Sequence, residues 1–385
     1  MNKEIIYLDN AATTFPKPVS ILNEMIETYI RIGVSPGRGS YDLSGEAEEF
    51  VNRVRLQVSN FFGNDDPSRV VFTYNATDAI NLLIQGLIEP GCHVVSSRLE
   101  HNSVLRPLHH FQELGTIRFD LAPFDSQGFI DPEEVARAIT SKTRFVILNH
   151  GSNVLGTVQP VEQIGTLCKE RGVPLILDVT QTAGILPIDM RKWGVSAVAF
   201  TGHKSLYGPT GIGGLVLNRN LDVRTTRFGG TGLDSDSLIH SQDYPHRLEA
   251  GTINLLGVIG LSSGIRYLEK VGLEKLYAQE MSLTKRLRDG LSSLKKVRLY
   301  CAQSLENHLP LLSCNIQGMD PEQVSAILDG DFGIATRAGL HCAPLVHQDL
   351  GTSPLGGVRF SLGCFNTLEE IEQVVEAMAS ISQFQ

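Results

Sequence analysis

The chain contains the apolar run Val173-Pro174-Leu175-Ile176-Leu177-Asp178, which ends in a carboxylate. A strand with one face in water alternates apolar and polar residues, whereas a strand covered on both faces reads as a continuous apolar run. We therefore expect a buried strand over Pro174–Val179. Six further strands are predicted, most of them from runs of the same kind: Arg69–Thr73, His93–Ser97, Ile117–Ala122, Arg144–Asn149, Ala197–Thr201 and Gly213–Leu217.

Helical patterns lie between several of these strands. One example is Val161–Arg171, in which Ile164, Leu167 and Cys168 are apolar. Strands that alternate with helices are typical of an α/β domain with a mostly parallel sheet. The sequence therefore predicts a large α/β domain around a mostly parallel, seven-stranded sheet.

The pattern changes after about residue 255. A long helical stretch near Val258–Leu294 precedes strand candidates at Leu311–Ile316 and Gly357–Ser361, and a helix at Leu368–Ala379 closes the chain. This order predicts a smaller α+β domain. We expect residues 17–257 to form the large domain, and residues 1–16 together with 258–385 to form the small one.

Composition narrows the range of functions. The 385 residues include 42% hydrophobic residues, and the formal net charge is −9, which argues against a general nucleic-acid or anionic-membrane surface. No stretch approaches the roughly 18 apolar residues of a membrane helix, and no secretory signal is evident. The six cysteines form no Cys-x-x-Cys pair, so we expect a cytoplasmic protein with free thiols and no metal site.

Lys204 lies in a segment between two predicted strands, Thr201-Gly202-His203-Lys204-Ser205. Most loop lysines are simply solvated. Near the end of a sheet, however, loss of water would lower the pKa of the amine and favour its condensation with a carbonyl group. The flanking His203 and Ser205 and the glycine-rich run that follows favour this second interpretation.

Three further features follow strands of the same predicted sheet. Asp178 could be a metal ligand, a base, the partner of a cationic ring nitrogen, or only the cap of a turn. Ala76 and Thr77 begin a helix and could bind a phosphate or form an ordinary cap. His101 could stack on a planar ring, transfer a proton, or be structural. Ligands of open α/β sheets bind at the carboxyl ends of strands, so we expect these residues to share one pocket with Lys204.

With these residues the chain resembles the fold-type I pyridoxal-phosphate enzymes of the class V aminotransferase family, and within it the cysteine desulfurase and selenocysteine lyase branch. The resemblance covers nearly the whole chain. It rests on segments that follow one another in the family's order: Tyr7–Thr13, Glu100–Asn102, Asn153–Gly156, Asp178–Gln181, Thr201–Lys204, Glu249–Thr252, Arg337–Ala343 and Val358–Ser361.

The resemblance implies a role for each residue at the cofactor. Lys204 would carry pyridoxal phosphate covalently, Asp178 would pair with the ring nitrogen, and His101 would stack on the ring and act in catalysis. Gln181 would donate to the phenolic oxygen of the ring, and Asn153 would lie near the ring. The residues implied at the phosphate are Ala76, Thr77, Thr201 and His203.

The resemblance also implies substrate contacts and a dimer. Arg359 would clamp the carboxylate of the substrate bidentately, with Ala11 and Asn153 beside it. In the family, residues at the positions of Gly251 and Thr252 reach the phosphate of the neighbouring subunit, which implies a homodimer with shared active sites.

Cys342 decides which reaction the resemblance implies. In desulfurases the cysteine at this position attacks the sulfur of the substrate, leaving L-alanine and a persulfide that passes to an acceptor protein, in iron–sulfur cluster assembly for example. Such a thiol needs help to ionise, which His341, Arg337 or the substrate would supply. The short Arg337–Ala343 loop resembles group II (SufS-like) members, although Leu340 replaces a frequent second histidine.

Other hypotheses remain open at this point. A selenocysteine lyase is one alternative, and a cystine or cysteine C–S lyase that yields pyruvate without using Cys342 is another. A non-catalytic protein that binds the cofactor or relays sulfur is a third. The combination of Lys204, Asp178, His101 and Arg359 favours an enzyme.

Overall fold

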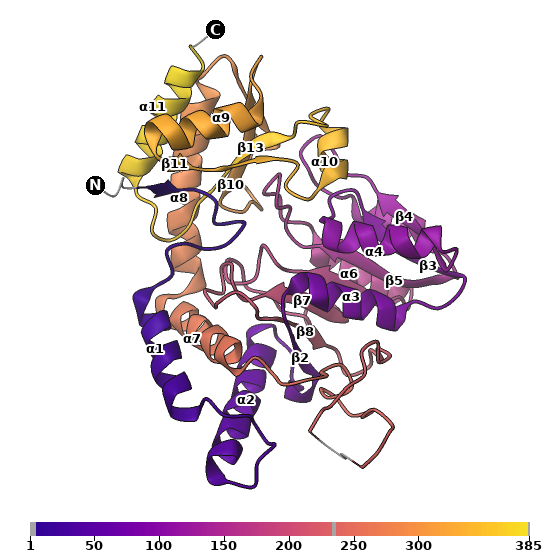
Figure 1. The fold of residues 1–385 in the computed structure, drawn as a ribbon. Coiled ribbons are helices and arrows are strands. Elements are labelled where there is room, and N and C mark those ends of the chain that lie inside the picture. The colour runs from indigo at the N-terminus through magenta and orange to yellow at the C-terminus, as the bar shows by residue number, and fades with distance from the viewer. Residues whose placement is uncertain (1–4, 233–235, 384–385) are drawn as a thin grey trace.

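Two sheets organise the chain in the computed structural model, which describes residues 5–232 and 236–383 (Figure 1). The larger has seven strands in the order β2-β8-β7-β6-β5-β3-β4. Its strands are β2 (Val70–Thr73), β3 (Cys92–Ser97), β4 (Ile117–Ala122), β5 (Thr143–Asn149), β6 (Leu175–Asp178), β7 (Ala197–Thr201) and β8 (Gly213–Leu217). β8 pairs antiparallel with β2 and β7, while the remaining neighbours pair parallel, so the predicted mostly parallel seven-stranded sheet is confirmed.

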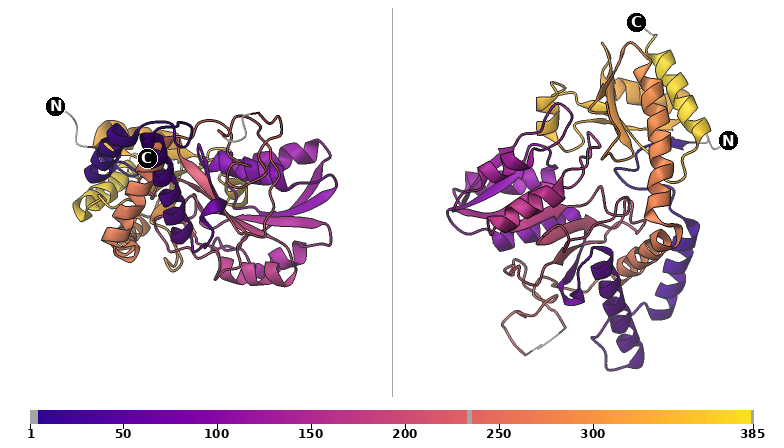
Figure 2. Two further views of the ribbon diagram at one scale, coloured as in Figure 1. Left: turned by 90° about the horizontal axis from the view of Figure 1, so that it is seen from below. Right: turned by 180° about the vertical axis from the view of Figure 1, so that it is seen from behind.

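Helices cover both faces of this sheet, as the side chains of its central strands require. Along β5, Phe145 and Ile147 join one apolar cluster, whereas Val146 and Leu148 join another. The first cluster includes α3 (Ala76–Leu87) and α4 (Asn102–Glu113), and Figure 2 shows these helices on one side of the sheet. The second cluster includes residues of α2 (Asp42–Phe61), α5 (Pro132–Ala138), α6 (Val161–Glu170) and α7 (Leu255–Val271).

The smaller sheet is antiparallel, in the order β12-β13-β10-β9. Its strands are β9 (Val297–Tyr300), β10 (Leu311–Ile316), β12 (Arg337–Gly339) and β13 (Gly357–Ser361). The helices of this part of the chain are α8 (Leu273–Ser292), α9 (Pro321–Ile327), α10 (Pro344–Asp349) and α11 (Leu368–Ile381). β1 (Ile6–Tyr7) pairs parallel with β11 (Ile334–Ala335), and Asp9 forms a bridge with Ser361 of β13, so the N-terminal segment lies against the small sheet. The division into two domains remains a prediction.

The helical stretch expected near Val258–Leu294 is two helices rather than one. Gly272, between α7 and α8, has a φ of +92°, a conformation that only glycine adopts readily, so the helix breaks there. α7 packs against α1 (Val19–Ile32) and α2, and its buried side chains join the core of the large sheet. α8 contributes Leu283, Leu287 and Leu291 to the core of the small sheet instead.

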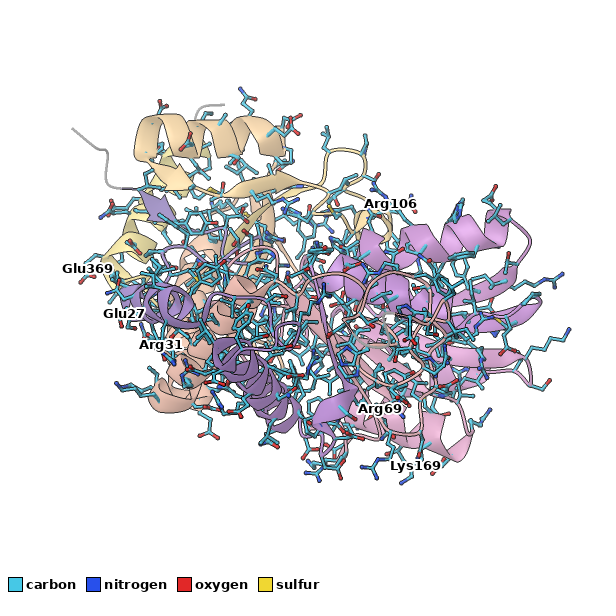
Figure 3. The ribbon with its side chains drawn as sticks, turned by 60° about the horizontal axis from the view of Figure 1, so that its bottom comes forward. Glu27, Arg31, Arg69, Arg106, Lys169 and Glu369 are labelled. Atoms are coloured by element: carbon cyan, nitrogen blue, oxygen red, sulfur yellow. The ribbon has the colours of Figure 1, made fainter. Side chains whose placement is uncertain are left out.

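Charged side chains such as Glu27 and Arg31 of α1 and Lys169 of α6 lie on the outside of the molecule (Figure 3). Over residues 5–232 and 236–383, no helix is long and apolar enough to cross a membrane. The same residues contain no cluster of three or more His, Cys, Asp or Glu side chains arranged to hold a metal ion.

Candidate active site

A cavity of about 300 Å³ lies at the carboxyl ends of the large sheet's parallel strands. Pockets at this edge are where open α/β sheets bind ligands. Eleven of the fourteen predicted site residues line it: Ala11, Ala76, Thr77, His101, Asn153, Asp178, Gln181, Thr201, His203, Lys204 and Arg359. These residues come from segments up to 348 positions apart, from Ala11 to Arg359, so the fold brings together residues that are far apart in the sequence.

Lys204 is held in a loop between β7 and β8 by backbone hydrogen bonds. Tyr207 donates its N–H to the Lys204 carbonyl at 2.8 Å, and the Gly202 N–H donates to the Ile212 carbonyl at 2.9 Å. Burial lowers the pKa of the Lys204 amine to about 8, and the positive charge of Arg359 adds to this effect, while Asp178 opposes it. An amine of this kind is a usable nucleophile near neutral pH.

Asp178 and His101 face the same cavity from neighbouring strand ends. Asp178 is the last residue of β6, and its Oδ1 accepts the Thr180 N–H at 2.9 Å. His101 is the N-cap of α4, and its Nδ1 accepts the Ser103 N–H at 3.0 Å. Because Nδ1 accepts this bond, the neutral imidazole carries its proton on Nε2. Burial lowers the pKa of His101, although the charge of Asp178 opposes that shift.

Hydrogen-bond donors gather at one end of the cavity, near the start of α3. The Asn75 side chain caps that helix by accepting the Asp78 N–H at 3.0 Å, a bond that does not use the N–H groups of Ala76 and Thr77. The Thr201 hydroxyl is buried without a hydrogen-bond partner. A buried hydroxyl without a partner costs free energy, so this end of the cavity is suited to a ligand that brings acceptor oxygens.

His203 borders this end of the cavity and is neutral. Its Nδ1 lies 3.1 Å from the Thr13 hydroxyl. Burial, together with the charges of Lys204 and Lys17, lowers the pKa of His203 to about 4. At neutral pH His203 can therefore offer one N–H to an anion without adding charge.

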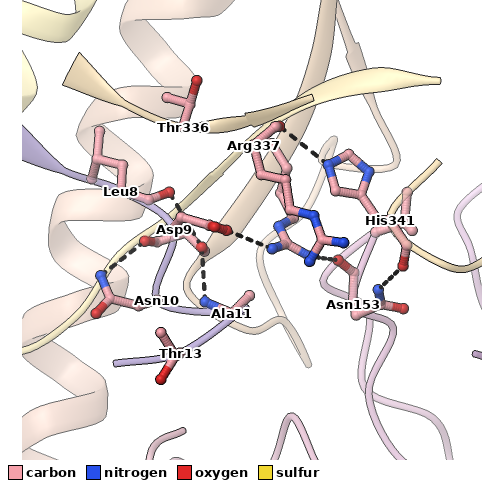
Figure 4. Close-up of polar contacts among 12 residues, drawn as sticks. Leu8, Asp9, Asn10, Ala11, Thr13, Asn153, Thr336, Arg337 and His341 are labelled. Atoms are coloured by element: carbon pink, nitrogen blue, oxygen red, sulfur yellow. Dashed lines mark hydrogen bonds and ion pairs between the residues drawn. The ribbon is translucent and has the colours of Figure 1, made fainter. Parts of the chain in front are cut away.

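Arg359, on β13, is 1% exposed and paired with a carboxylate that the sequence did not predict. Its Nη2 donates to Asp9 Oδ1 at 2.7 Å, and its Nη1 donates to the Asn153 carbonyl at 3.0 Å. Figure 4 labels the two acceptor residues, Asp9 and Asn153. The Nε of Arg359 has no hydrogen-bond partner. Burial lowers the pKa of Arg359 and the charge of Asp9 raises it, so the ion pair helps to hold the guanidinium cation in a dry site.

Cys342 lies beside the cavity and does not line it. It borders an adjoining groove of about 550 Å³, which shares Thr77, His101 and Ser103 with the cavity and also includes Arg106. Nη2 of Arg337 donates to its Sγ at 3.9 Å.

The backbone at Cys342 is strained. His341 and Cys342 have φ values of +50° and +57°, a left-handed conformation that costs roughly 1–2 kcal/mol for each residue with a side chain. Two bonds hold the turn: the Asn102 N–H donates to the Cys342 carbonyl at 2.7 Å, and Asn153 Nδ2 donates to the His341 carbonyl at 2.7 Å (Figure 4). Strain that persists in this way is a common feature of functional sites.

Gly251 and Thr252 do not join the cavity of their own chain. They line two other cavities, and Arg38 donates to the Gly251 carbonyl at 2.9 Å and to the Thr252 hydroxyl at 3.2 Å.

Nothing in the sequence pattern gave Asp9 a role, and Arg337 and His341 were expected only to help Cys342 ionise. Arg337 and His341 line the cavity, and Asp9 pairs with Arg359. Asp9 stands next to Asn10 and Ala11 in a segment that the family resemblance already used. That proximity was the available signal, but nothing local in the sequence links Asp9 to an arginine 350 residues away.

Comparisons with known proteins agree with this arrangement. The family model described as Aminotransferase class-V matches residues 6–374. A probable cysteine desulfurase of Methanothermobacter thermautotrophicus is 34% identical over 386 residues, covering 99% of this chain and 95% of the relative. One from Pyrococcus abyssi is also 34% identical, covering 97% and 93% of the two chains. The apo structure of a cysteine desulfurase from Thermococcus onnurineus superposes with a TM-score of 0.93 at 33% identity, covering 99% and 95%.

Proposed function

The chain belongs to the class V aminotransferase family, and from this premise we propose that it is a pyridoxal-phosphate-dependent cysteine desulfurase. The observation that carries the proposal is the convergence of Lys204, Asp178 and Arg359 on one cavity, with Cys342 at its edge. The amine of Lys204 and the carboxylate of Asp178 would bind the cofactor, and Arg359 would bind the carboxylate of an amino acid. The thiol of Cys342 would accept the sulfur of the substrate.

The cavity fits the cofactor. Its volume of about 300 Å³ is within the range of small-molecule sites. Lys204 would hold the aldehyde carbon, Asp178 the ring nitrogen and Gln181 the phenolic oxygen, with His101 and Asn153 against the ring. The phosphate would lie at Ala76, Thr77, Thr201 and His203, where the unpartnered Thr201 hydroxyl provides a donor. When bound, pyridoxal phosphate supplies an electron sink for charge at the Cα of an amino acid.

Arg359 would orient the substrate. Its guanidinium already contacts Asp9 and Asn153, yet its Nε and its further N–H groups remain for a carboxylate. Ala11 and Asn153 border the same part of the cavity. A substrate carboxylate held there would place the amino group toward Lys204, whose neutral amine can accept and return a proton.

Cys342 would take the sulfur. Its thiolate attacks the sulfur of the substrate, an S–S bond forms, and the Cβ–S bond breaks. The electron pair of the broken bond stays with carbon, which takes up a proton to give L-alanine, while the cysteine retains a persulfide. Arg337, whose Nη2 lies 3.9 Å from the sulfur, would stabilise the thiolate.

A selenocysteine lyase would differ from the desulfurase in its substrate, because it too leaves alanine. A C–S lyase that forms pyruvate is the second candidate, and one observation favours it. Cys342 borders the adjoining groove rather than the cavity itself, and a lyase that forms pyruvate has no need of this thiol. The two reactions release different carbon products, alanine and pyruvate.

The partners and the location are part of the same proposal. Gly251 and Thr252 line two other cavities and not the one around Lys204, which supports a homodimer in which they reach the partner's site. The persulfide would pass to an acceptor protein, for example in iron–sulfur cluster assembly. All six cysteines are free thiols, which supports a reducing compartment such as the cytoplasm.

The test is product analysis with L-cysteine and a reductant, and with L-selenocysteine in parallel. We expect alanine and sulfide from cysteine. Cys342→Ser should abolish both while keeping the absorbance of the bound cofactor, and Cys301→Ser, another half-buried thiol, should keep full activity. Pyruvate as the main product, or full alanine formation by Cys342→Ser, would contradict the proposal.

A further inference from the structure

An ion pair outside the cavity joins the large sheet to the segment that carries Cys342. Arg98 directly follows β3, and its Nε and Nη2 donate to the two carboxylate oxygens of Asp349 at 2.6 and 2.7 Å. Asp349 is the last residue of α10, which begins two residues after Cys342. The two side chains are 30% and 31% exposed, so the pair lies at the surface and is only partly shielded from water. Two parallel charge-assisted bonds are the most specific form of such a pair.

The segment between Cys342 and Asp349 has little stability of its own. α10 has six residues, and helices this short form only when tertiary contacts support them. Before it stands the left-handed turn at His341 and Cys342, which is strained. Figure 1 shows α10 on the side of the small sheet that faces the large one.

Residues that follow strands of the large sheet hydrogen-bond to this segment at its two ends. At the start, Asn102 and Asn153 hold the carbonyls of Cys342 and His341. At the end, Arg98 holds Asp349. Arg98 and Asn102 stand four residues apart in the chain, so one short stretch after β3 holds both ends of the segment.

We propose that the Arg98–Asp349 pair is a latch that keeps α10 docked and so positions the Cys342 thiol beside His101. Both residues are positioning residues, because neither lines the cavity. The pair prevents the strained turn from relaxing by fixing the helix that follows it. The catalytic meaning of the latch rests on the proposed desulfurase reaction, but its effect on the order of the segment does not.

The amide of Asn102 is a direct reporter of the latch, because it donates to the Cys342 carbonyl only while the segment is docked. The best perturbation is Asp349→Asn, which keeps the shape of the side chain and lies 247 residues from the reporter. We expect hydrogen–deuterium exchange at Asn102 to become about twofold to fivefold faster in the holoenzyme, the range expected for loss of a partly exposed ion pair. Alanine formation should show a kcat lower by about twofold to tenfold with an unchanged KM for cysteine and unchanged cofactor absorbance.

Two further variants separate a latch from general destabilisation. Arg98→Asp combined with Asp349→Arg reverses the pair and should restore slow exchange at Asn102. Arg286→Gln removes a surface ion pair between α8 and α11, whose donor lies 3.1 Å from Glu372, and should leave exchange at Asn102 unchanged. Failure of the reversed pair to restore protection, or equal exchange in Asp349→Asn and the wild type, overturns the latch.

The outcomes also distinguish the latch from the proposed function. Faster exchange in Asp349→Asn, with no alanine formed from cysteine even by the wild type, would leave the latch standing and reject the desulfurase. Alanine formation by the wild type, with exchange and kcat unaltered in Asp349→Asn, would reject the latch alone.

Discussion

Recapture of pyridoxal phosphate by the apo protein, followed as a function of pH, measures the state of the Lys204 amine directly. Only a neutral amine attacks the aldehyde. The Lys204 pKa is lowered to about 8, first by burial and then by the charge of Arg359. The rate of capture should therefore follow a titration centred near pH 8 instead of near the usual lysine value of about 10.4.

The size of the effect follows from the two pKa values. At pH 7 a group with a pKa of about 8 is roughly 9% neutral, whereas an ordinary lysine is about 0.04% neutral, a difference of more than 200-fold. Between pH 7 and pH 9 the rate should rise about tenfold and then level off. Stopped-flow absorbance of the bound cofactor, recorded from pH 6 to pH 11 on protein freed of cofactor, measures the curve.

Two variants test the cause of the shift. Arg359→Met removes a positive neighbour and should move the midpoint to higher pH, whereas Asp178→Asn removes a negative neighbour and should move it lower. Both variants are expected to weaken binding of the cofactor. The midpoint of the pH titration is therefore compared, and not the amplitude of the absorbance change. A wild-type midpoint at pH 10 or above, or shifts of the same sign in the two variants, would refute the electrostatic account of Lys204.

The same pKa carries a consequence for stability. Because the folded pKa lies below the unfolded value of about 10.4, the unfolded chain binds more protons between pH 8 and pH 10.4. The cost of burying Lys204, about 3 kcal/mol, is fully present below pH 8 and disappears as the pH rises through 10.4. The apo form of Lys204→Met should therefore be more stable than the wild type at pH 7, and equally stable near pH 11, in urea unfolding.

Three other predictions concern single residues. Arg359→Lys should raise the KM for cysteine about tenfold to a hundredfold, measured by alanine release, because a lysine cannot clamp a carboxylate bidentately. Glu249→Gln should lower the urea-unfolding free energy by about 3 kcal/mol, because it leaves the guanidinium of Arg55, 2.7 Å away and 6% exposed, without its counter-charge. Gly184→Ala should lower the melting temperature far more than Gly172→Ala, because both have positive φ but only the first methyl would meet a backbone carbonyl, at 2.2 Å.

The large sheet was predictable because its strands carry a strong local signal. Ile117–Ala122, Ala197–Thr201 and Gly213–Leu217 match the observed strands to the residue. Two N-terminal helices were not predicted: α1 leaves Ile26 and Ile30 exposed, and α2 has a polar average composition. Their helical form depends on packing against α7, a contact that lies more than 200 residues away in the chain.

The candidate site was predictable where each residue follows a strand, and less so elsewhere. Asp178, His101 and Lys204 stand at strand ends, and the parallel sheet brings such ends to one edge. The pairing of Asp9 with Arg359 arises from the association of the first residues with the small sheet, which no local pattern reveals. The left-handed turn at Cys342 was likewise hidden, because neither of its residues is a glycine.

The charges around the cavity explain how one environment can both bind anionic ligands and activate the amine of Lys204. Its lining contains three cationic side chains, Lys204, Arg337 and Arg359, against the single carboxylate of Asp178. This excess of positive charge favours the two anions that the proposed reaction brings, the phosphate of the cofactor and the carboxylate of the substrate. The charges of Arg359 and Arg337 also lower the Lys204 pKa, so the groups that attract the anions make the nucleophile easier to deprotonate. Replacing either arginine by a neutral residue should therefore weaken binding and activation together.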